Sequence, residues 1–142
     1  MKVVDANVLV YAVNEDAVHH QQAREWLDRS LAGASGVGFS WLVMMAFLRL
    51  TTHPSIFGNP LTAAAAVAQL EAWMAQPAAH ILEPTSRHLL LMAELLSEVG
   101  RGGNLVNDAH LAALAVEHRA TIVSFDNDFD RFGVVRWEHP GR

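Results

Sequence analysis

Residues 103–129, GNLVNDAHLAALAVEHRATIVSFDNDF, decide the fold of this chain. Their first half predicts a helix that begins near Val106, because Asn107 and Asp108 suit the positive end of a helix dipole. Apolar residues then recur at helical spacing, and residues 119–120 end the helix.

The residues that follow predict a buried strand and a turn. Residues 121–123 form a β-branched run that is too short for another helix, and the polar cluster 126–128 is typical of a turn. In a parallel sheet, such a strand would deliver Asp126 and Asp128 to the carboxyl-terminal edge.

Asp108 shares a helix face with Leu111, Ala112 and Ala115, the face expected to pack. An acid at the margin of the core needs a cation or hydrogen-bond donors. A purely structural interpretation is that Asp108 complements the helix dipole and that Asp126 shapes a turn. A functional interpretation needs a third acid.

That third acid is Asp5. Residues 1–4 predict a strand that ends at Asp5, and residues 8–12 are apolar again, so the carboxylate lies between two core segments. Asn7 is placed either to hydrogen-bond the turn or to orient Asp5.

Length and composition predict one globular domain over residues 1–142. Hydrophobic residues make up 51% of the chain and charged residues 18%, which is enough apolar material for a core without metal or disulfides. The absence of cysteine excludes disulfides, thiolate zinc sites and cysteine nucleophiles. A net charge of −5 argues against a broad electrostatic grip on nucleic acid, but it allows a local basic rim.

Nothing in the sequence predicts contact with a membrane. No apolar run reaches the length of a membrane span, and residues 1–4 read as a strand rather than as a signal region. We therefore expect a cytoplasmic protein. The adjacent pair His19 and His20 is expected to be solvated in the first turn of a helix.

The remaining elements alternate in type along the chain. Helices are predicted over residues 18–31, 41–50, 62–74 and 85–99, and strands over residues 36–40, 80–82 and 134–137. This alternation predicts an α/β fold, a three-layer α/β/α sandwich with a central mainly parallel sheet. Asp5 and Asp126 then share one edge of the sheet, and Asp108 reaches it if its helix packs beside the first strand.

The predicted helices 41–50 and 62–74 are unusually apolar. Ordinary core packing explains most of this, and a surface for a partner or a second copy of the chain is the alternative. Arg49 is the only charge in residues 41–50; it either complements the end of the helix or meets an acidic cluster or a phosphate.

Four stretches together resemble the PIN-domain ribonucleases, and most closely the VapC toxins of type II toxin–antitoxin modules. They are DANVL from Asp5, FLR ending at Arg49, NDAHLAALA from Asn107 and SFDNDF from Ser124. The resemblance covers nearly the whole chain. It implies a PIN-like sandwich, dependence on Mg²⁺ or Mn²⁺, RNA cleavage, a homodimer and inhibition by a cognate VapB antitoxin.

The resemblance also implies site residues. Asp5, Asp108 and Asp126 fall on metal-site acids of the family, with Asp128 as a fourth candidate. The chain departs from the family pattern at Ala46, where many relatives carry a Glu, so the second metal position lacks one of its usual ligands.

The chemistry of the acids supports a metal site independently. Carboxylates that share a pocket raise one another's pKa unless a cation neutralises them, and Mg²⁺ prefers oxygen ligands. Our hypothesis is that Asp5 and Asp108 hold the principal ion and that Asp126 and Asp128 hold a second ion or its waters. A water activated by the ion would attack an RNA phosphate in line, and Arg49 would orient an acid or contact RNA.

Two other functions fit the sequence less well. In an aspartyl-nucleophile phosphohydrolase Asp5 would be phosphorylated, but the second aspartate of that class would fall at Asn7, which leaves no general acid. The non-enzymatic alternative is a PIN-like binding module that lost catalysis together with the Glu that many relatives carry where this chain has Ala46. The intact set of aspartates argues against this alternative.

Overall fold

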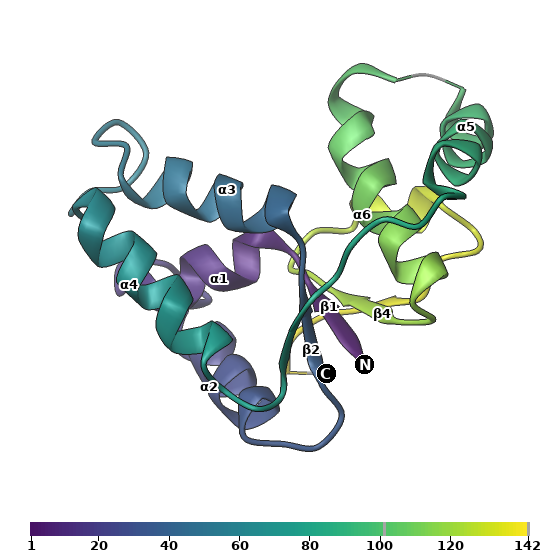
Figure 1. Ribbon diagram of the computed structural model, residues 1–142. Helices are drawn as coiled ribbons and strands as arrows, with labels where there is room; N and C mark the ends of the chain where they lie inside the picture. Colours follow the sequence, from purple (N-terminus) through teal and green to yellow (C-terminus); the bar gives the residue numbers. More distant parts are fainter. Residues whose placement is uncertain (101, 142) are drawn as a thin grey trace.

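The computed structural model describes residues 1–100 and 102–141 (Figure 1). In chain order the elements are β1 (Lys2–Val4), α1 (Ala6–Val13), α2 (His20–Leu31), β2 (Val37–Phe39), α3 (Trp41–Thr51), α4 (Ala63–Met74), β3 (Ala79–Ile81), α5 (His88–Val99), η1 (Gly103–Leu105), α6 (Val106–Glu117), β4 (Thr121–Val123), η2 (Asp128–Arg131) and β5 (Trp137–Glu138). The two η elements are short 3₁₀ turns. This alternation of strands and helices confirms the predicted α/β class.

The five strands form one parallel sheet in the order β3-β2-β1-β4-β5. Strand β1 pairs with β2 on one side and with β4 on the other. The chain therefore builds the sheet outward from β1 in one direction and then crosses back to β4. Ligand sites of open parallel sheets form where the strand order reverses in this way, beyond the carboxyl ends of the strands.

The helices cover both faces of the sheet. The connections from β1 through β2 to β3 place α1, α2, α3 and α4 together on one side, and the return connection places α5 and α6 on the other (Figure 1). This three-layer arrangement confirms the predicted α/β/α sandwich.

The path of α6 explains how an acid in the middle of the chain reaches the carboxyl edge. Helix α6 leads directly into β4, so it runs against the strand direction, and its first turn lies at the carboxyl ends of the strands. Arg119, with a φ of 52°, reverses the chain between the two elements. The predicted helix start at Val106 is confirmed, and Asp108 lies in the first turn.

The core is built from short buried strands and small helix residues. Val3, Val4, Ile122 and Val123 are fully buried in the two central strands. Helix α6 buries four alanines, which let its backbone pack closely on the sheet. Gly38 in β2 allows a similarly close contact, because a Cβ at that position would lie 2.5 Å from Cδ1 of Leu82.

The structure corrects some predicted boundaries. Strand β3 ends at Ile81, whereas residues 80–82 were expected, and α5 begins at His88 rather than near residue 85. The last strand was wrong over residues 134–136, since β5 spans only Trp137–Glu138. Val134 is exposed, and the amide of Val135 donates to the Phe132 carbonyl in a turn instead of joining the sheet.

Among the described residues, no helix combines the length and the apolar character that crossing a membrane requires.

Candidate active site

Asp5 occupies the junction of β1 and α1. Its backbone N–H donates to the Val123 carbonyl, and its Oδ1 accepts from the Ala6 N–H at 2.8 Å, so the carboxylate caps α1. Burial raises the pKa of Asp5, hydrogen bonds from Ser124 and Ala6 oppose that shift, and the charges of Asp126 and Asp128 add to it. The sequence predicted Asp5 at the end of the first strand, between two core segments and on the same edge of the sheet as Asp126.

Ser124 joins the two central strands at this edge. Its fully buried hydroxyl donates to Asp5 Oδ2 at 2.8 Å and accepts from the backbone N–H of Asp126 at 3.0 Å. The amide of Asn7 donates to the same hydroxyl at 3.1 Å. No role was predicted for Ser124 from the sequence, although its hydroxyl directly follows a buried strand and precedes an acid by two residues.

Asn7 holds the turn and approaches Asp5 at the same time. Its Nδ2 lies 3.4 Å from Asp5 Oδ2, and its Oδ1 accepts from the Phe125 N–H at 3.2 Å. Both interpretations offered from the sequence, bonding the turn and orienting Asp5, therefore apply. A side-chain amide cannot act as a general acid, so Asn7 at the position of the second aspartate argues against the phosphohydrolase alternative.

Asp108, in the first turn of α6, lies close enough to the other acids to feel their charges. Burial and then the charges of Asp5, Asp128 and Asp126 raise its pKa to about 6, and Arg131 opposes the shift. The structure therefore brings Asp108 into the neighbourhood of the acids that follow β1 and β4. This is the arrangement that the sequence analysis made conditional on the packing of α6.

Asp126 and Asp128 follow β4 in a tight turn. Asp126 is exposed, and its Oδ1 accepts from the Asp128 N–H at 3.1 Å. The pKa of Asp128 is raised by burial and by its hydrogen bond to Asp126, whereas Arg131 lowers it. Nη1 of Arg131 lies 3.4 Å from Asp128 Oδ1.

Arg131 is thus a cation beside the acids, and it was not predicted from the sequence. The signal was a basic residue three positions after an acid in a short turn. Arg49, the residue suggested instead, is exposed in the last turn of α3 and takes part in none of the ion pairs among the described residues. Its contact with RNA stays a prediction.

The four carboxylates suit a divalent cation by their chemistry. Asp5, Asp108 and Asp128 all have raised pKa values, and Arg131 is the only positive charge that enters these shifts. A hard cation with oxygen ligands would relieve that repulsion. Within residues 1–100 and 102–141, no three His, Asp or Glu side chains already stand in a metal-binding arrangement. Ala46, partly buried on α3, adds no oxygen ligand from its side chain.

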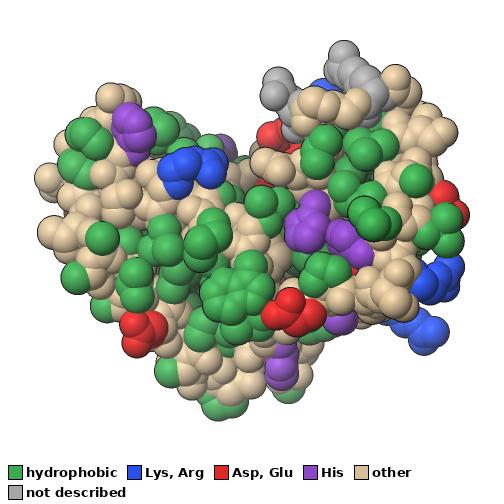
Figure 2. Space-filling model, turned by 45° about the horizontal axis from the view of Figure 1, so that its top comes forward, with side chains coloured by type: hydrophobic (Ala, Val, Ile, Leu, Met, Phe, Trp, Pro, Cys, Tyr) green, Lys and Arg blue, Asp and Glu red, His purple; other side chains and the backbone are tan. Residues whose placement is uncertain are grey.

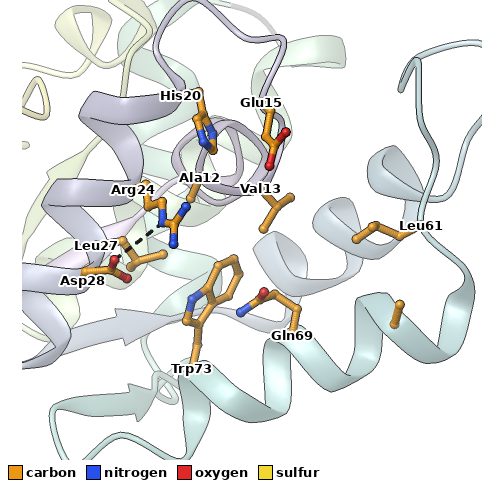
Figure 3. Close-up of a pocket in the computed structure, with 11 residues that line it drawn as sticks. Ala12, Val13, Glu15, His20, Arg24, Leu27, Asp28, Leu61, Gln69 and Trp73 are labelled. Carbon is orange, nitrogen blue, oxygen red and sulfur yellow. Dashed lines mark ion pairs between the residues drawn. The ribbon is translucent and has the colours of Figure 1, made fainter.

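Two cavities are lined by different residues of α1. One, of about 260 Å³, is lined by Asn7, Tyr11, Phe125, Asp126 and Asn127, so it opens directly beside the acids. The other, of about 500 Å³, lies between α1, α2 and α4, with Trp73, Arg24 and Gln69 among its lining residues (Figure 3). The larger cavity contains none of the four predicted acids, so we assign the chemistry to the carboxyl edge of the sheet.

The fold and this acidic edge define a PIN domain. The PIN-domain family model matches residues 2–135, and the chain belongs to that family.

Relatives of this chain within the PIN family are VapC ribonucleases. Ribonuclease VapC37 of Mycobacterium tuberculosis is 55% identical over 140 residues, which are 99% of this chain and 97% of the relative. Ribonuclease VapC25 of the same organism is 43% identical over 140 residues, 99% of each chain. Identity at this level over the full length places the chain among the VapC ribonucleases.

Solved structures agree on the fold. VapBC2 from Rickettsia felis, bound to a DNA fragment from its promoter, superposes with a TM-score of 0.73 at 20% identity and 97% coverage of both chains. Mycobacterium tuberculosis VapC20, described as a sarcin-ricin loop cleaving toxin, gives a TM-score of 0.69 at 19% identity, covering 96% of this chain and 99% of that one.

Proposed function

We propose that this protein, as one PIN domain over residues 1–142, is the toxic endoribonuclease of a toxin–antitoxin module and hydrolyses RNA phosphodiester bonds with Mg²⁺ or Mn²⁺. The observation that carries the proposal is the gathering of Asp5, Asp108, Asp126 and Asp128 at the carboxyl edge of the sheet, in a chain of the VapC ribonuclease family. Cleavage of cellular RNA would place the protein in the cytoplasm.

The four acids would hold different ions because their surroundings differ. Asp5, fixed by bonds from Ser124, Asn7 and the Ala6 N–H, and Asp108, from the first turn of α6, would hold the principal ion. Asp126 and Asp128 would hold a second ion or its waters. A bound divalent cation supplies a nucleophilic water at neutral pH and neutralises the charge that develops on the phosphate.

The remaining groups would orient the acids and the RNA. The Ser124 hydroxyl bonds to both the Asp5 carboxylate and the Asp126 backbone N–H, and so fixes the positions of these two acids relative to each other. Arg131, partly exposed beside Asp128, is positioned to receive a phosphate of the RNA once a cation has taken over the neutralisation of Asp128. Arg49 is a second candidate for contact with RNA.

Two partners complete the proposal. A cognate VapB-type antitoxin would neutralise the enzyme, and a second copy of the chain would form a homodimer. Hydrophobic side chains are spread over the face shown in Figure 2. Met45 on α3 and Leu89 and Leu90 on α5 are among the exposed apolar residues. Exposed apolar side chains of this kind support a covered surface. Where a short reading frame beside the gene encodes a VapB-type protein, its coexpression should rescue growth, and unrelieved toxicity would contradict the antitoxin assignment.

The nuclease is tested by incubating purified protein with a mixed RNA pool and Mg²⁺, Mn²⁺ or chelator. Cleavage should require the metal and should disappear in Asp108→Asn. The matched control is Asp16→Asn, an exposed aspartate in the loop after α1, which should cut like the wild type. Calorimetry gives a second readout, since Asp108→Asn should weaken Mg²⁺ binding. Cleavage that survives chelation or the Asp108→Asn change would overturn the proposal.

A further inference from the structure

The small cavity beside the acids has an aromatic wall. Tyr11 and Phe125 line it together with Asn7, Asp126 and Asn127, and its volume is about 260 Å³. Sites for drug-sized ligands usually measure roughly 300–1,000 Å³, so this cavity suits a single planar group. Phe125 stands between Ser124 and Asp126 in the chain, which ties the cavity directly to the acidic edge.

A cluster of rings holds the aromatic wall in place. His19 stacks on Phe125 with centroids 4.6 Å apart and an interplanar angle of 17°, and Tyr11 is tilted against Phe125 at 5.3 Å. His139 meets Phe125 edge-on at 4.8 Å. The expectation of solvated histidines was therefore wrong for His19, which is partly buried in this cluster, and for His20, whose Nδ1 lies 2.8 Å from the Tyr11 carbonyl oxygen.

The polar groups around the cavity are available for a ligand. Tyr11 brings a hydroxyl to the cavity wall, and Asn127, which is exposed, brings a side-chain amide. The lining contains no Lys or Arg, and its one charged residue is Asp126. Such a lining would repel a phosphate, whereas it would accept a neutral planar group with donors and acceptors on its edge.

We propose that this cavity is a subsite for one nucleobase of the RNA, the base next to the phosphate that is cut. This inference rests on the proposed function. Proteins bind unpaired bases by stacking them on aromatic side chains and by hydrogen-bonding their edges. Here Tyr11 and Phe125 would supply the stacking surface, and Asn127 would supply the hydrogen bonds. The base would lie in the cavity while its phosphate reaches the acids, so the subsite selects the cleavage position.

The first test does not involve cleavage. Backbone amide NMR spectra in chelator are recorded with adenosine, guanosine, cytidine or uridine, and with ribose as the control that lacks a base. At least one nucleoside should shift the amides of Tyr11, Phe125 and Asn127, and ribose should not. Phe125→Leu should weaken the binding of that nucleoside at least fivefold. His53→Leu, which removes an exposed ring outside the cavity, should leave the affinity for that nucleoside unchanged.

The second test reads out selectivity. A random pool of short oligoribonucleotides is cut with Mg²⁺ and the products are sequenced. The wild type should favour one base on one side of the cut, and Asn127→Ala, a change to an exposed side chain, should weaken that bias and raise KM more than it lowers kcat.

The outcomes separate the two proposals. If RNA is cut in an Asp108-dependent way but no nucleoside shifts these amides and the bias survives Asn127→Ala, the base subsite is wrong. If no RNA is cut while nucleosides bind as described, the cavity is a nucleobase site, but the nuclease assignment fails and with it the link to a cut phosphate.

Discussion

The hydroxyl of Ser124 donates a 2.8 Å hydrogen bond to Oδ2 of Asp5, joining two residues 119 positions apart in the chain. The same oxygen accepts from the Asp126 backbone N–H at 3.0 Å. One buried side chain therefore positions acids from β1 and from the turn after β4.

Ser124→Ala should lower metal affinity and RNA cleavage roughly 10- to 100-fold while the protein stays folded, because groups that orient metal ligands typically contribute that much. The comparison is Ser40→Ala. Ser40 is equally buried, but its hydroxyl caps α3 by accepting from the Val43 N–H. That change should cost about 1 kcal/mol of stability and leave cleavage at saturating metal unaltered. Equal activity losses in the two variants would show that Ser124 is merely structural.

Asp108 should make the metal-free protein less stable as the pH rises. Because its folded-state pKa is raised to about 6 from 3.8, its stabilising contribution is complete below the unfolded value and is lost as the pH passes through the folded one. Urea unfolding in chelator should therefore show Asp108→Asn gaining stability relative to the wild type between about pH 4 and 7. Excess Mg²⁺ should reverse that trend. Parallel pH curves for the two proteins would contradict it.

Glu117 should anchor α5 to α6. Its side chain is 2% exposed, accepts from the Thr85 N–H at 2.6 Å and from the Thr85 hydroxyl, and pairs with His88. Burial raises the pKa of Glu117, but these hydrogen bonds lower it more. The stability it contributes is therefore present above its unfolded pKa and is lost as the pH falls through the folded value.

Glu117→Gln should cost about 1.5–3 kcal/mol of unfolding free energy at neutral pH, the range for hydrogen bonds to charged groups, and the loss should shrink in acid. Glu94→Gln on the exposed side of α5 is the control and should change little. Chemical denaturation at several pH values measures both. A loss that stays constant down to acid pH would argue against an ionised Glu117.

Gly38→Ala should destabilise the centre of the sheet. The added Cβ would lie 2.5 Å from Cδ1 and 2.9 Å from Cγ of the buried Leu82. The side chain of Leu82 and the backbone that carries it must therefore move. Overpacking of this kind typically costs about 1–3 kcal/mol. Gly58→Ala, in an exposed loop where the nearest atom is 3.9 Å away, is the matched control. Equal thermal midpoints for the two variants would contradict the prediction.

The convergence of the acids was predictable because it follows from topology. Parallel strands end at a common edge, so Asp5 and Asp126 had to meet once β1 and β4 were recognised, and the direction of α6 brought Asp108 to the same place. Local periodicity was enough to find these elements.

Contacts that depend on exact side-chain placement were not predictable in this way. The bond from Ser124 to Asp5 requires the register of two strands, and the stacking of His19 on Phe125 requires the path of the loop after α1. The apolar residues Val134 and Val135 suggested a strand, but a turn at that point takes their backbone out of the sheet. Periodicity alone does not distinguish these cases.

The dispersal of the acids along the chain has a consequence for folding. Asp5 and Ser124 lie 119 positions apart, and they meet only once β4 has paired with β1 at the centre of the sheet. Contacts between residues so distant in the sequence require a large loop to close first. A partly folded chain without this pairing would therefore lack the proposed cation site, so metal binding should report the native fold and not an intermediate.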